Sequence, residues 1–113
     1  MLKFLMEARF TTIGAEGVRQ EGGTSRRHAV ERAVESVGGE VESFHFAFGE
    51  YDTYTIMGLP DHESAAALSS AISSSGAVAT RMVVLLTPEE IDEASKRAVD
   101  YRAPVSEYHA AVV

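Results

Sequence analysis

The chain has 113 residues, 45% of them hydrophobic and 24% charged, and these values are typical of one ordinary globular domain. Its 17 acidic and 10 basic residues give a formal net charge of −7, which argues against nucleic acid as a partner because a phosphate backbone would be repelled. There is no cysteine, which excludes disulfides, thiolate nucleophiles and cysteine-ligated metal centres.

Hydrophobic periodicity predicts the first two elements. Residues 3–11 alternate apolar and polar side chains, as in a half-buried strand. Residues 12–23 contain several glycines and are interpreted as a connection or a lid with room for a short helix. Residues 25–37 then repeat apolar side chains at helical spacing, with Thr24 or Ser25 as the expected cap. Gly38 and Gly39 are suited to end this helix.

The second half of the chain predicts a hairpin, a helix, a strand and a last helix. Two strand-like runs, 41–48 and 51–58, flank Gly49-Glu50, which fits a two-residue type II′ turn. Asp61 is expected to cap a second helix that ends at Gly76. A strand is predicted over 77–86. Residues 87–90 match a capping box, so a third helix is expected to reach about residue 99.

This order of elements predicts an α+β fold, a ferredoxin-like βαββαβ sandwich with a four-stranded antiparallel sheet. Right-handed crossovers place both long helices on one face and leave the other face bare. Residues 1–99 are expected to form this single domain, and residues 100–113 a C-terminal tail. The tail is either disordered or docks Tyr101, Val105 and Tyr108 across a partner protomer.

The hairpin register decides which side chains reach the bare face. A two-residue turn pairs Phe48 with Tyr51 and places the phenylalanines at 44, 46 and 48 under the helices. The polar residues expected on the bare face are Glu7, Arg9, Ser43, His45, Asp52, Tyr54 and Arg81. Aliphatic residues share that face, namely Leu5, Ile56, Val83 and Leu85. A face this apolar predicts a homodimer, whose stacked sheets would enclose a small-molecule cavity.

Several spaced motifs stand out in the second half of the chain. They are Phe48-Gly49-Glu50-Tyr51-Asp52, Pro60-Asp61-His62-Glu63-Ser64-Ala65-Ala66-Ala67, Gly76-Ala77-Val78 and Leu85-Leu86-Thr87-Pro88-Glu89-Glu90. Together they resemble the GYD-domain family, small ferredoxin-like proteins named for a Gly-Tyr-Asp motif at the hairpin. The departure here is Glu50, which stands between Gly49 and Tyr51. The resemblance implies a dimer akin to dimeric α+β barrels. It carries over no catalytic role, because the family has no established activity.

Seven residues are predicted to form the site. The candidates for catalysis are His45, Asp52 and Tyr54, and those for ligand binding are Glu7, Arg9, Tyr51 and Arg81. As an enzyme, Asp52 or His45 would take a proton, Tyr54 would stabilise the resulting anion, and an arginine would orient the substrate. The structural alternatives are that Tyr51 packs at a strand end, that Asp52 accepts backbone hydrogen bonds, that His45 and Tyr54 form a polar contact, and that the arginines form ion pairs.

No nucleotide, dinucleotide or serine-hydrolase motif is present, and the histidines lack metal-ligand spacing, so neither a metal nor another cofactor is expected. No membrane partner is expected, and the start of the chain does not resemble a signal peptide, so a cytoplasmic protein is predicted. The leading hypothesis is a homodimer that binds a partly apolar molecule, neutral or anionic. The alternatives are a cofactor-free isomerase, cyclase or monooxygenase-like enzyme, and a non-catalytic interaction or regulatory module.

Overall fold

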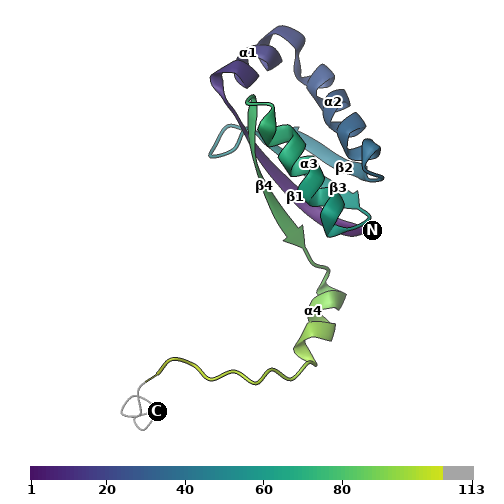
Figure 1. Ribbon diagram of the computed structural model, residues 1–113, viewed down its shortest axis with the longest axis vertical. Coiled ribbons are helices and arrows are strands. Elements are labelled where there is room, and N and C mark those ends of the chain that lie inside the picture. Colours follow the sequence, from purple (N-terminus) through teal and green to yellow (C-terminus); the bar gives the residue numbers. More distant parts are fainter. Residues whose placement is uncertain (106–113) are drawn as a thin grey trace.

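A four-stranded antiparallel sheet with α-helices packed on one face forms the body of the protein (Figure 1). The computed structural model describes residues 1–105, so Tyr108 lies outside the described residues. The elements are β1 (Leu2–Phe10), α1 (Thr12–Glu21), α2 (Gly23–Ser36), β2 (Glu40–Phe46), β3 (Thr53–Leu59), α3 (His62–Ser74), β4 (Val78–Leu85) and α4 (Pro88–Ser95). The sheet order β2-β3-β1-β4, with every neighbouring pair antiparallel, confirms the predicted ferredoxin-like α+β fold.

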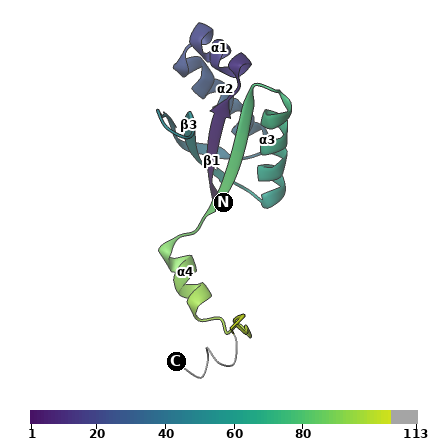
Figure 2. The ribbon, with the colours of Figure 1, turned by 90° about the vertical axis from the view of Figure 1, so that its left-hand side faces the viewer.

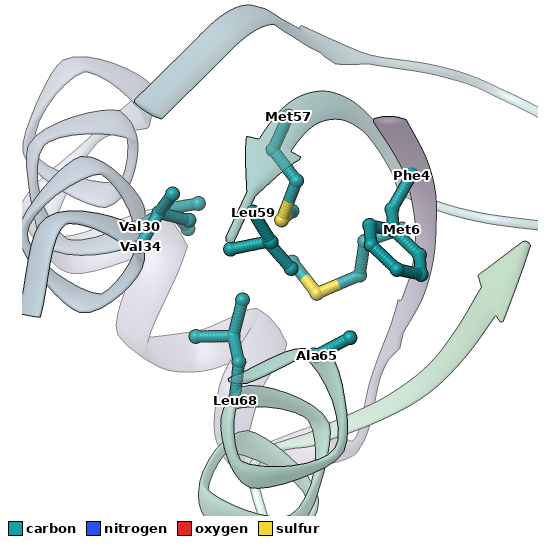
Figure 3. Close-up of a cluster of buried hydrophobic side chains, with 8 residues drawn as sticks. All are labelled: Phe4, Met6, Val30, Val34, Met57, Leu59, Ala65 and Leu68. Carbon is teal, nitrogen blue, oxygen red and sulfur yellow. The ribbon is translucent and has the colours of Figure 1, made fainter. Parts of the chain in front are cut away.

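The hydrophobic core lies between the sheet and helices α2 and α3 (Figure 3). Its buried members are Phe4, Met6, Val30, Val34, Met57, Leu59, Ala65 and Leu68. Burial alternates along β1, where Phe4, Met6 and Ala8 are buried and the residues between them are only half-buried. Each large apolar side chain buried here contributes about 1.5–3 kcal/mol, so the sheet cannot exchange its two faces without losing the core. We call the face opposite α2 and α3 the bare face.

The helix boundaries follow the predicted capping residues in two cases out of three. Asp61 caps α3, and Thr87 caps α4 in a complete capping box. The predicted caps of α2, Thr24 and Ser25, are wrong. The stretch before α2 is itself a helix, α1, and Gly22 separates the two with a backbone φ of 88° that favours glycine. The chain therefore turns from one helix directly into the next.

The β2–β3 hairpin differs from the prediction at its tip. The predicted pairing of Phe46 with Thr53 is confirmed, but β2 ends there, and Phe48 is fully exposed instead of buried under a helix. The predicted two-residue turn is wrong. The amide of Ala47 donates to the carbonyl of Asp52 at 2.9 Å, so the residues between them form a four-residue loop. The residues of this loop are not paired with a neighbouring strand, so no strand hydrogen bonds hold Phe48 against the helices.

The chain leaves the body of the domain after β4. Helix α4 and the residues after it extend away from the sheet, and α4 packs extensively on no other element of the described chain (Figures 1 and 2). The described residues consequently span 64 × 29 × 22 Å. We call residues 86–105 the C-terminal arm. None of the helices in residues 1–105 has the length and apolar character needed to cross a membrane.

Replacing Thr55 by valine is expected to stabilise the protein. Its side chain is buried, and among the described residues its hydroxyl has no hydrogen-bond partner. Valine has nearly the same shape and removes the unpaired polar group, so the free energy of unfolding should rise by about 1 kcal/mol, measured by urea denaturation.

The matched control is Thr80→Val. Thr80 is in β4, on the face of the sheet that also carries Thr55. The Thr80 hydroxyl lies 2.7 Å from that of Ser69 and 3.0 Å from that of Ser73, so its removal should lower the free energy of unfolding by about 1 kcal/mol. Equal losses in both variants would show that the Thr55 hydroxyl is satisfied.

Candidate functional site

A row of polar side chains crosses the bare face, with one residue from each strand. His45 of β2 is in register with Tyr54 of β3, Tyr54 with Glu7 of β1, and Glu7 with Arg81 of β4. The residues on either side of Glu7 and Tyr54 are buried beneath the helices, so alternation directs the row toward the bare face. We call these four residues the polar row. The sequence predicted all four for this face.

An apolar patch borders the polar row on the same face. Leu5 is in register with Ile56 on one side and Val83 on the other, and each lies two residues along its strand from a member of the polar row. Leu85 continues the patch along β4, and all four side chains are half-buried in the single chain. Ser43 lies beside Ile56 at the edge of this patch. The bare face therefore joins an apolar half to an ionisable half.

The hairpin loop brings Tyr51 against the polar row. Its ring meets the ring of Tyr54 edge-on, with centroids 6.2 Å apart and an interplanar angle of 76°. The guanidinium carbon of Arg9 lies 5.3 Å from the Tyr51 ring centroid, within cation–π range. Arg9 also donates through Nε and Nη2 to the carbonyl of Glu50, at 3.0 and 2.7 Å. Arg9 thus anchors the loop rather than forming the predicted ion pair.

Arg81 is the second arginine of the site, and like Arg9 it is exposed. The Tyr51 side chain is the main cause that raises the pKa of Arg81, and the Glu7 carboxylate adds to it, so this guanidinium stays charged at every physiological pH. The Arg81 side chain is exposed, and in residues 1–105 no carboxylate lies within 4.0 Å of it. A charged, planar guanidinium can donate two parallel hydrogen bonds to a carboxylate.

The Asp52 carboxylate is engaged by the backbone. Its Oδ2 accepts a hydrogen bond from the amide of Phe10 at 2.8 Å, and the Asp52 amide donates to the carbonyl of Ala8 at 2.8 Å. These bonds extend the contact between β1 and the hairpin past the last paired residues of β3. Of the two alternatives for Asp52, the contacts match the structural one, acceptance of backbone hydrogen bonds.

One contact of the site had no signal in the sequence. The Glu50 carbonyl accepts both bonds from Arg9, and a backbone acceptor in a loop leaves no trace in residue type or spacing. Within residues 1–105, this geometry supplies no set of side chains that could ligate a metal ion. Across the part of the chain that the structure describes, no three histidine or acidic side chains are grouped so that they could hold a metal ion.

Comparison with known proteins identifies one family. The model of the GYD domain family matches residues 4–95, which include β1 from Phe4 onward, the other three strands and the whole of α4. Neither a search of curated proteins nor a search of solved structures gave a match. The family match confirms the resemblance found in the sequence motifs and bears on the fold rather than on an activity.

Removing the Asp52 side chain is expected to destabilise the protein. Asp52→Ala leaves the Phe10 amide without its acceptor, so the free energy of unfolding should fall by about 1–2 kcal/mol in urea denaturation. Asp52→Asn keeps an acceptor oxygen at the same place and should lose less than half as much. If the alanine variant were as stable as the parent protein, the structural assignment of Asp52 would fail.

Proposed function

The chain belongs to the GYD domain family, and from this premise we propose that it is a homodimer that binds a partly apolar, anionic small molecule between two bare faces. The observation that carries the proposal is the polar row, which crosses all four strands and directly borders the apolar patch. A ligand with a charged end and an apolar body matches this division of the face.

The apolar patch supports the dimer, because association of two bare faces would bury it. Leu5, Ile56 and Val83 form a continuous apolar row over three neighbouring strands, and within residues 1–105 helices α2 and α3 pack on the opposite face of the sheet. A second bare face stacked about 10 Å away would cover this row without changing the fold. Because a twofold axis presents the same surface from both protomers, one patch is enough to make the interface.

Arg81 supports the choice of an anion. Arg9 is held by the Glu50 carbonyl, whereas Arg81 is exposed and free of a carboxylate partner within the described residues. His45 and the Tyr54 hydroxyl lie along the same row and can donate hydrogen bonds to a ligand carboxylate. Between two stacked sheets such contacts are shielded from water, which strengthens them.

Proton-abstraction chemistry has less support than binding. The carboxylate with the greatest promise as a base, Asp52, accepts a hydrogen bond from the Phe10 amide and lies at the strand end. His45 and Tyr54 remain as a cross-strand pair, and their geometry alone serves hydrogen bonding to a ligand as well as proton transfer.

Binding can be tested with 2-naphthoate, an aromatic carboxylate, titrated into the ¹⁵N-labelled protein. Amide shifts are expected on the bare-face strands, and Arg81→Gln should weaken binding by at least tenfold, which is about 1.4 kcal/mol. Arg32→Gln, which removes an exposed arginine from α2, is the matched control and should bind as the parent does. Shifts that are absent, or that persist unchanged in Arg81→Gln, would refute the proposed site.

The dimer can be tested by sedimentation equilibrium. The parent protein is expected to have the mass of two chains, and Val83→Glu should weaken association by at least tenfold because it buries a carboxylate in the apolar patch. Ala71→Glu makes the same change on the exposed side of α3 and should leave the mass unchanged. A monomeric parent protein would contradict the proposal.

A further inference from the structure

The C-terminal arm carries apolar side chains that are exposed within the described part of the chain. Leu86 is 57% exposed, Ile91 51%, Val99 81% and Tyr101 74%. Helix α4 has only eight residues, and helices shorter than about 12–15 residues are marginal in water unless they pack against another surface. Within residues 1–105, α4 therefore has a complete capping box but packs extensively on no other element.

Helix α4 carries a dense negative charge, and Lys96 and Arg97 follow it directly. Four of the eight residues of α4 are acidic, namely Glu89, Glu90, Asp92 and Glu93. An open hollow of about 510 Å³ lies along this helix and is lined by Leu86, Ala94, three glutamates of α4 and Arg97. A partner surface must accordingly offer positive charge together with apolar or aromatic contacts.

One end of the groove between α2 and β2 has that character. Two hollows of about 270 and 350 Å³ adjoin there, and Arg27 and Phe44 line both. The first hollow has no acidic residue in its lining and includes Phe46, which is 44% exposed, whereas Glu31 and Glu42 line the second together with His28. The carboxylate of Glu31 is the one that pairs with Arg27, and its Oε1 lies 4.0 Å from the Arg27 Nε. β2 is also an edge strand of the sheet.

We propose that the arm of one protomer lies in the α2–β2 groove of a second copy, with the acidic side of α4 facing Arg27. This inference rests on the proposed dimer and specifies how each protomer clasps the other. β4 and β2 are the opposite edges of the sheet. When two such sheets stack about a twofold axis parallel to the strands, β4 lies over the partner's β2, and each arm leaves its own domain at the Glu40 end of that strand, from which it turns back along β2 to reach Arg27.

The arm is long enough for this path. α4 covers about 12 Å at 1.5 Å per residue, and the ten residues from 96 to 105 can add up to about 33 Å. Their sum exceeds both of the shorter dimensions of the described chain, 29 and 22 Å. The direction of α4, away from its own sheet, also favours contact with another molecule (Figure 2).

Paramagnetic broadening in mixed samples tests the clasp. The chain has no cysteine, so Ala98→Cys provides a single nitroxide site just after α4. Labelled chains without ¹⁵N are mixed with ¹⁵N-labelled parent chains, so that any broadening is intermolecular. The expected result is loss of the amide signals of Arg27 and Phe44 relative to those of α3. Ala71→Cys, labelled on the exposed side of α3, is the control and should leave the groove signals unchanged.

The outcomes separate the clasp from the dimer itself. If sedimentation gives a dimer but the groove signals stay sharp, the clasp is overturned and the proposed function stands. Broadening that occurs only when the nitroxide and ¹⁵N are on the same chain, diluted with unlabelled chains, would show an arm folded back on its own domain and would also overturn the clasp. A monomer would overturn both proposals.

Discussion

The arrangement of the bare face depends on the burial of Phe4, Met6 and Ala8 under the helices. These three residues share one side of β1, and the residues between them must therefore lie on the other. β1 is a central strand and pairs with both β3 and β4. Its alternation therefore decides which residues of those two strands face the helices. A core of methionine, phenylalanine and aliphatic side chains thus determines where Glu7 is placed, although Glu7 belongs to no core.

This constraint explains how much of the fold and of the site the sequence predicts. Alternation in the strands places the four residues of the polar row, and these positions do not depend on the exact length of the hairpin turn. The tip of the hairpin depends on contacts between segments distant in sequence, such as the bond from Ala47 to Asp52 and the bonds from Arg9 to Glu50. Phe48 illustrates the result, because its apolar character predicted burial and its loop leaves it in solvent.

Arg9 and Arg81 show why residue type and face do not settle a role. Both arginines belong to strands of the same sheet, and Tyr51 stands close to each. The loop supplies Arg9 with a carbonyl acceptor, so its donors are used in holding Tyr51 and Glu50 in place. The pKa of Arg81 is raised mainly by the Tyr51 side chain, and Glu7 adds to this without a close ion pair. The same type of side chain therefore anchors a loop in one strand and, in the proposed function, binds the ligand in another.

Two apolar surfaces of the described residues suit a partner, the half-buried patch on the sheet and the exposed apolar side chains of the arm. In the proposed dimer a twofold axis would use each of them twice, since the patch would pair with its own copy and each arm would meet a groove on the other protomer. The groove is formed by β2, the edge strand whose register shifts between Val41 and Ser43, and a shift of this kind twists an edge away from simple strand addition. In the proposed dimer, the acidic arm with its apolar anchors would cover the edge strand β2 and protect it further. The stacked sheets would at the same time cover the apolar patch of the bare face.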